Sequence, residues 1–303
     1  MGDKEELRQI IERTKLEPGK RVDLNRFPTN WEEPDKYSLN GLRFSKENAE
    51  ELLARSQKEL AKIQEVLWAD NRYSLLIILQ GMDAAGKDGI IKHVMSGVNP
   101  QGCQVTSFKA PSSEELDHDF LWRCIKVLPE KGKIGIFNRS YYEEVLVVRV
   151  HTDFLLNQRL PDGEFGQSFW SARYHSINEL EKHLIRSGTL IIKLFLNVSK
   201  EEQRNRLLER IEAPEKRWKF NPNDVKERDL WLKYMDAYRE MLEATSTEHA
   251  PWYVLPADQK WLSRVLAAIV LTSKIKFLGL QYPELPKEYM KAVEEAKAKL
   301  QRE

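Results

Sequence analysis

The stretch "LLIILQGMDAAGKDG", residues 75–89, decides the fold that we expect for this chain. A continuous run of apolar residues leads into a glycine-flanked loop, and a helical pattern follows it. The segment GMDAAGK fits G-x-x-x-x-G-K, in which glycines let several backbone N–H groups face one anion while the lysine reaches its outer phosphates. We therefore predict a strand at 74–80, a phosphate-binding loop and a helix from Lys87; a plain tight turn is the alternative.

The loop departs from the usual pattern at the position after its lysine. Asp88 stands where nucleoside triphosphatases carry a serine or threonine that binds magnesium. Asp83 offers a carboxylate that could hold a hard cation from within the loop, and an Asx-type turn is the alternative for it. We expect a metal-associated phosphate chain to bind here, in a manner unlike an ordinary ATP donor. The residues expected to contact phosphate are Gly81, Ala84, Ala85, Gly86, Lys87, Asp88 and Gly89.

Short apolar strands and helical patterns alternate along the rest of the chain, which is typical of an α/β fold with a doubly wound parallel sheet between two helical layers. Ser45 is the expected N-cap of the first long helix. The further strands are expected at 104–110, 133–138, 189–198 and 252–257. The helices are expected at 46–70, 87–97, 113–127, 141–150, 168–187, 199–211, 223–246 and 259–277.

Composition limits the classes of partner. Lysine and arginine total 48 against 47 acidic residues, so we expect no nucleic-acid partner, and any polyanion must meet a local cationic cluster. The two cysteines, Cys103 and Cys124, show no metal-ligand spacing, which favours structural thiols in a reducing compartment. No apolar run is long enough to cross a bilayer and the N-terminus lacks a signal-peptide core, so a cytoplasmic protein without a membrane partner is expected.

A second cluster of polar residues follows the strand at 133–138, in "IGIFNRSYYEEVLVVRVH" (134–151). Asn138 can coordinate only weakly through oxygen, whereas Arg139 can hold phosphate bidentately. Glu143, Glu144 and Arg149 fall on the predicted helix that follows, where a purely structural role is the alternative.

These two segments resemble family-2 polyphosphate kinases, with "GMDAAGKDG" as the first motif and "FNRSYYEEVLVVRVH" as the second. The resemblance runs from about residue 15 to 285 and includes "NPQGCQVTSFKAPSSEELDHDFLWR", "EKRWKFNPNDVKERDLW" and "TSTEHAPWYVLPADQKW". It implies a P-loop kinase-like fold and reversible transfer of the terminal phosphoryl group of inorganic polyphosphate to a nucleotide, with Mg²⁺. The second motif is similar to the subgroup that phosphorylates both mono- and diphosphates, AMP and ADP, with GMP and GDP as further acceptors.

Carried onto this chain, the resemblance makes Asp83 the magnesium ligand and Lys87 the phosphate anchor. It makes Asn138 and Arg139 the contacts from the second strand and places Glu143 near the nucleotide. Further substrate contacts are expected at Lys109 and Arg149. The family tends to form dimers or tetramers, so a homodimer or homotetramer is expected.

The segment "KEEQRNRLLERIEAPEKRWKF" lies where a nucleotide kinase has its lid and supplies the expected cationic cluster, although a solvated charged helix is the alternative. The cations expected to contact substrate are Arg204, Arg206, Arg210, Lys216, Arg217 and Lys219. We expect an N-terminal arm at 1–44, a P-loop kinase-like catalytic domain at 45–282 with its lid at about 200–232, and a C-terminal helix at 283–303.

Two other functions compete with a polyphosphate-dependent nucleotide kinase. An ATP-dependent P-loop kinase of a nucleotide or small molecule is the first, and Asp88 counts against it. A non-catalytic phosphate-binding regulator is the second, and Asp83, Lys87 and Arg139 together disfavour it.

Overall fold

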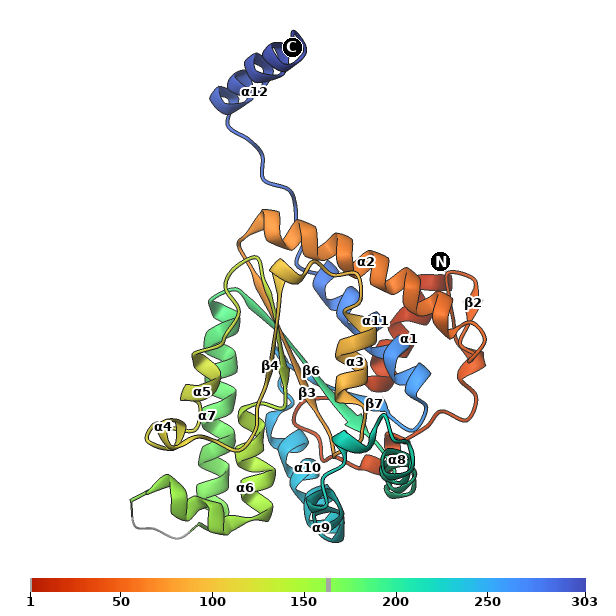
Figure 1. The fold of residues 1–303 in the computed structure, drawn as a ribbon, viewed down its shortest axis with the longest axis vertical. Helices are drawn as coiled ribbons and strands as arrows, with labels where there is room; N and C mark the ends of the chain where they lie inside the picture. The colour runs from red at the N-terminus through yellow and green to blue at the C-terminus, as the bar shows by residue number, and fades with distance from the viewer. Residues whose placement is uncertain (1, 162–164) are drawn as a thin grey trace.

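The computed structural model describes residues 2–161 and 165–303, and at its centre lies a sheet of five parallel strands (Figure 1). Across the sheet the strands are β4 (Cys103–Ser107), β5 (Ile134–Asn138), β3 (Ser74–Gln80), β6 (Thr189–Asn197) and β7 (Trp252–Pro256). After the central β3 the chain forms β4 and β5 on one side of it, and then β6 and β7 on the other side. The carboxyl end of β3 therefore lies where the strand order reverses, the usual ligand site of such sheets.

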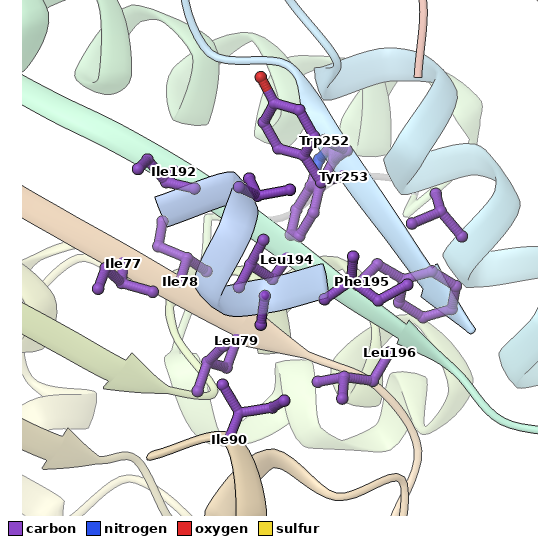
Figure 2. Close-up of a cluster of buried hydrophobic side chains, with 14 of the residues drawn as sticks. Ile77, Ile78, Leu79, Ile90, Ile192, Leu194, Phe195, Leu196, Trp252 and Tyr253 are labelled. Carbon is purple, nitrogen blue, oxygen red and sulfur yellow. The ribbon is translucent and has the colours of Figure 1, made fainter. Parts of the chain in front are cut away.

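The central strands are buried because helices cover both faces of the sheet. All seven residues of β3 and all five of β7 are buried, which agrees with their continuous apolar sequences. Figure 2 shows side chains of β3, β6 and β7, including Ile78, Leu194 and Trp252, gathered in this core. The doubly wound parallel sheet predicted from the sequence is confirmed.

The helices form two layers, one on each side of the sheet (Figure 1). The helices α2 (Ala49–Asp70), α3 (Lys87–Val94) and α11 (Lys260–Lys276) pack together on one side. The other side carries α6 (Val147–Val150), α7 (Gln167–Arg186) and α10 (Trp231–Thr245). The predicted three-layer α/β/α architecture is therefore confirmed.

The N-terminal segment packs along the β7 side of the body. Its helix α1 (Gly2–Thr14) contacts α11 and β7, and the Leu16 amide then donates to the Trp252 carbonyl at 2.8 Å. A two-stranded hairpin and short 3₁₀ turns follow. These elements are η1 (Leu24–Arg26), η2 (Pro34–Lys36), β1 (Ser38–Leu39) and β2 (Leu42–Arg43).

Several predicted boundaries are wrong. The strand predicted at 104–110 ends at Ser107, because β4 is an edge strand whose five residues are all at least partly exposed. A short 3₁₀ turn, η3 (Pro100–Gly102), leads into it. The first long helix begins at Ala49 instead of after Ser45, whose hydroxyl accepts from the Asn48 amide at 3.3 Å in the preceding turn.

Two predicted helices are interrupted, one of them at a local polar contact. The region 113–127 forms only α4 (Ser113–Leu116) and α5 (Trp122–Ile125), since the Asp119 carboxylate accepts from the Leu121 amide at 2.9 Å and favours a turn between them. The region 223–246 divides at Leu230 into α9 (Asn223–Asp229) and α10.

The predicted helix 141–150 is a 3₁₀ turn, η4 (Tyr141–Val145), followed by α6. The neighbouring Tyr141 and Tyr142 hydroxyls both donate to Oε1 of Glu181 in α7, at 2.9 and 2.7 Å. Consecutive residues on an α-helix point about 100° apart, so one α-helical face cannot present both to a single carboxylate. Glu181 is itself paired with Lys193 of β6 at 2.7 Å, fully buried.

The remaining elements are peripheral. Helix α8 (Lys200–Glu212) and the turn η6 (Arg217–Lys219) follow β6, and η5 (Thr152–Gln158) follows α6. Helix α12 (Lys287–Leu300) extends away from the body (Figure 1), and all of its residues are exposed. In the described part of the chain, no helix combines the length and apolar character needed to span a membrane.

Candidate active site

The loop after β3 has the geometry that an anion cradle requires. Gly81 has φ +150°, and a Cβ there would come within 2.8 Å of the Leu196 carbonyl oxygen on β6, so the backbone approach excludes a side chain. Gly86 has φ +113° and directly precedes α3, which begins at Lys87. The loop therefore ends at the N-terminus of a helix, where backbone N–H groups and the helix dipole favour an anion.

Lys87 is buried beneath the loop. Its Nζ donates to the carbonyl oxygens of Gly81 at 2.6 Å and Met82 at 3.1 Å, and only 8% of the residue is exposed. Burial lowers the pKa of this ammonium group to about 8. The predicted phosphate anchor thus lies under the loop, held by uncharged carbonyls.

The tip of β5 brings three of the predicted residues together. Arg139, with φ +63°, donates from one terminal nitrogen to Oδ1 of Asp83 at 2.5 Å and from the other to Oε2 of Glu143 at 3.2 Å. Glu143, followed by Asp83, raises the pKa of this guanidinium against the effect of burial. A left-handed backbone at a non-glycine residue is uncommon, and it directs this side chain across the loop.

Asn138 forms an unexpected link to the loop helix. Its amide nitrogen donates to Oδ1 of Asp88 at 2.8 Å. The residue that replaces the usual loop hydroxyl therefore fixes the tip of β5. Gly89, a predicted phosphate contact, lies inside α3 with the Arg264 guanidinium beside it.

Sequence reasoning missed Asp224 on α9. Burial raises the pKa of its carboxyl group, and the nearby Asp83 carboxylate raises it further. Arg210, a predicted lid cation, forms an ion pair with Asp224 at 3.6 Å. Asp224 lies within the motif "EKRWKFNPNDVKERDLW" that carries the family resemblance, but nothing in the motif distinguishes this acid from its charged neighbours, because only the fold brings α9 to the loop.

The other predicted lid cations occupy two environments. Arg206 is 5% exposed and directed inward, against the phosphate loop. On the surface, Arg204 pairs with Glu201 at 3.4 Å, and Lys216 pairs with Glu209. Around η6 the side chains of Arg217, Trp218 and Lys219 are exposed, Trp218 to 77%.

A cavity of about 380 Å³ opens beside Arg139. Its walls include the rings of Phe108, Phe120 and Phe154, and the predicted residues Lys109 and Glu143 also line it. Arg149 is absent from the described lining of this cavity.

Arg149 instead contacts the α7–α10 layer. Its terminal nitrogen forms an ion pair with Glu240 at 2.6 Å, and its guanidinium lies 4.9 Å from the centre of the Trp170 ring. Glu144 lines the cavity as a buried residue and pairs with Arg173 at 3.2 Å. These contacts are consistent with the structural alternative for both residues.

A buried strand, a glycine loop, a lysine under it and an arginine from the adjacent strand tip define a phosphate-binding protein of the P-loop kinase class. The comparisons with known proteins narrow this class. The model of the family "Polyphosphate kinase 2" matches residues 43–281. The chain therefore belongs to the polyphosphate kinase 2 family, whose phosphotransferases generally need a divalent metal.

Two relatives match about nine tenths of the chain. An ADP-polyphosphate phosphotransferase of Rhodopseudomonas palustris is 52% identical over 88% of this chain and 90% of its own length. An AMP/ADP-polyphosphate phosphotransferase of Meiothermus ruber is 43% identical over 90% and 96%. The crystal structure of polyphosphate kinase 2 from Arthrobacter aurescens TC1 superposes with a TM-score of 0.81 at 38% identity, covering 94% of this chain and 96% of that one.

Proposed function

We propose that this chain transfers the terminal phosphoryl group of inorganic polyphosphate to AMP and to ADP, reversibly and with Mg²⁺. Its relatives carry names for both acceptors, and the family membership supports the donor. The observation that carries the proposal is the convergence of Lys87, Arg139 and Asp83 at the carboxyl ends of β3 and β5, next to an aromatic cavity.

The cavity fits the acceptor. Phe108, Phe120 and Phe154 offer apolar surface for a nucleobase, and Arg139 lies in the same lining, where it can meet the phosphate end of the nucleotide. The donor chain then occupies the phosphate loop. Donor and acceptor phosphates meet at Arg139, which borders both sites.

The reaction requires positive charge near the phosphates more than it requires a general base. A nucleotide phosphate oxygen is already ionised at neutral pH and forms the new P–O bond. The bond between the terminal and penultimate phosphates of the chain breaks, and the shortened chain leaves with its electron pair. The loop amides, Lys87 and Arg139 offset the repulsion between the two polyanions.

The donor set fits a hard cation. Asp83 and Asp224 bring carboxylate oxygens close enough for Asp83 to affect the pKa of Asp224. Within residues 2–161 and 165–303, no group of three or more His, Cys, Asp or Glu residues could hold a metal ion. This arrangement suits Mg²⁺, which usually takes one or two carboxylates and completes its shell with phosphates and water. When bound, Mg²⁺ would neutralise phosphate charge, with Asp83 as its principal ligand.

The same proposal includes GMP and GDP as further acceptors, since an aromatic wall accommodates either purine. A cytoplasmic homodimer or homotetramer also remains part of it. The exposed apolar side chains of α12, Tyr289 and Leu300 among them, offer surface for such an assembly.

An ATP-dependent P-loop kinase is the competing function. It needs the loop hydroxyl that holds magnesium, and here Asp88 is hydrogen-bonded to Asn138 in that place. The names of the relatives also favour polyphosphate as the donor.

The identity of the phosphoryl donor tests this proposal. AMP, Mg²⁺ and either long-chain polyphosphate or ATP are incubated with the protein, and the products are followed by phosphorus NMR. We expect ADP and then ATP from AMP and polyphosphate. Transfer to AMP from ATP alone, with polyphosphate inert, would replace the proposal by the competing one.

A further inference from the structure

The carbonyl groups of the phosphate loop are all engaged by the protein. Lys87 bonds the carbonyls of Gly81 and Met82, and the Ile90 amide donates to that of Gly86 at 3.0 Å. The three carbonyls between them, at residues 83–85, accept from one helix outside the loop. That helix is α8, the first element of the predicted lid.

Two side chains of α8 make these contacts. Gln203 donates from Nε2 to the Asp83 carbonyl at 3.0 Å. Arg206 donates from one terminal nitrogen to the carbonyls of Ala84 and Ala85, both at 2.9 Å. Gln203 is 1% exposed and Arg206 is 5% exposed, so water competes little for these bonds.

The guanidinium of Arg206 is fully used. Its other terminal nitrogen donates to the carbonyls of Ala257 at 2.5 Å and Asp258 at 3.1 Å, just after β7, and its Nε donates to Glu202 at 2.7 Å. An arginine has five N–H donors, and five acceptors surround this one. A side chain committed in this way has little capacity left for a substrate phosphate.

We propose that Arg206 and Gln203 are positioning residues that hold the phosphate loop in its anion-binding conformation by fixing the carbonyls of residues 83–85. A peptide whose carbonyl is held on one side presents its N–H on the other, so the bonds from α8 to the carbonyls of Asp83 and Ala85 turn the amides of residues 84 and 86 toward the phosphate chain. The Ala85 amide is engaged within the loop, where it donates to the Met82 carbonyl at 3.1 Å. The loop backbone needs these bonds because Ala84 has a φ of +62°, which is unfavourable for a residue with a Cβ.

This inference rests on the proposed function and revises one prediction made from the sequence. Arg206 was expected to contact substrate as a lid cation. The structure assigns it instead to the loop, so it acts on phosphate through the backbone. The arrangement also connects the start of the lid directly to the donor site.

The experiment compares Arg206→Gln, Arg206→Lys and Gln203→Met with the wild type, using Arg239→Gln on the surface of α10 as the matched control. Dissociation constants for tripolyphosphate and for AMP are measured by calorimetry. Loss of two or more bonds to the loop should weaken tripolyphosphate about tenfold or more in Arg206→Gln, with AMP within about twofold. Arg206→Lys should rescue little, since one ammonium cannot span the five acceptors.

A purely structural role would weaken both ligands in parallel, and that result would overturn the proposal, as would wild-type tripolyphosphate affinity in Arg206→Gln. Gln203→Met and Arg206→Lys are milder changes, so they decide the question if Arg206→Gln does not fold. A different result would contradict the proposed function itself: a wild type that neither binds tripolyphosphate nor forms ATP from it.

Discussion

The phosphate loop and the lid turn around η6 both present groups suited to phosphate, yet the protein holds them in opposite ways. In the loop, Lys87 is buried and carbonyls at residues 81–86 are hydrogen-bonded. In the lid turn, Arg217, Trp218 and Lys219 are exposed to solvent. If the proposed function holds, the donor site is organised before substrate arrives, and it lies beside a turn whose exposed side chains are available to close over the substrate.

The largest effect on this difference between loop and lid turn is expected from removing Lys87, the predicted phosphate anchor. Lys87→Ala deletes the charge beneath the phosphate chain and releases the carbonyls of Gly81 and Met82. We expect kcat/KM for polyphosphate to fall about 1000-fold, the upper range for losing one preorganised donor. Steady-state rates of ATP formation measure this, with Lys182→Ala on the surface of α7 as control. Activity within tenfold of the wild type would remove Lys87 from its assigned role.

The next largest effect should come from the proposed metal ligand. Asp83→Asn keeps the size of the side chain but removes its charge and weakens its ion pair with Arg139. We expect kcat to fall about 100-fold, with the Mg²⁺ concentration at half-maximal rate moving upward. A Mg²⁺ titration of the rate measures both, with the exposed Asp236→Asn as the matched change. An unaltered Mg²⁺ midpoint would contradict the assignment.

The pH dependence of KM in the wild type gives a further test of the role of Lys87. Because burial lowers its pKa to about 8, the free protein loses this charge as the pH rises above that value. We expect KM for tripolyphosphate to increase up to about tenfold per pH unit there. Lys87→Arg should flatten this limb, since arginine stays charged. A wild-type KM that is constant from pH 7 to 9 would argue against the lowered pKa.

The same shift has a consequence for stability with a defined sign. Between pH 8 and the ordinary lysine pKa of 10.5, the unfolded chain binds a proton at Lys87 that the folded chain has released. Through this group the free energy of unfolding therefore rises with pH across that window, and the gain is lost as pH falls toward 8. Urea unfolding of wild type and Lys87→Met at pH 8 and 10 measures the difference. Equal pH slopes in the two proteins would contradict it.

The smallest effect is expected in the lid turn. Trp218→Ala and Lys219→Ala remove exposed side chains that support little of the fold. Each should raise KM for polyphosphate only about threefold to fivefold, with the melting temperature unchanged and with the Lys219 effect fading at high salt. Lys62→Ala on α2 is the control. A loss as large as that of Lys87→Ala would reverse the comparison.

Sequence patterns identified the loop and the strand tip because each is local. Lys87 and Asp83 belong to one short motif, and Arg139 follows directly from the end of a buried strand. Asp224 and Gln203 gave no such signal, since only the fold brings α9 and α8 to the loop. Arg206 was predicted as a substrate contact, and its bonds to the loop carbonyls were not predicted, because sequence alone cannot distinguish an inward from an outward face of a strongly charged helix.

The wrong boundaries have local causes of the same kind. The Asp119 carboxylate favours a turn over continued helix, and the shared bonds of Tyr141 and Tyr142 to Glu181 require a tighter turn than a helical pattern indicates. The edge position of β4 shortens it. In each case a polar contact or a missing neighbouring strand outweighs periodicity.

A crystal structure with Mg²⁺ and a non-hydrolysable phosphate chain tests the central claim most directly, that the loop keeps its conformation on binding whereas the lid turn moves. We predict the chain's terminal phosphate between Lys87 and Arg139, residues 81–87 superposing within about 1 Å on the present structure, and a displacement of η6 toward the chain. A loop that rebuilds around the phosphates while η6 keeps its place, or a chain bound away from the carboxyl ends of β3 and β5, would contradict the account.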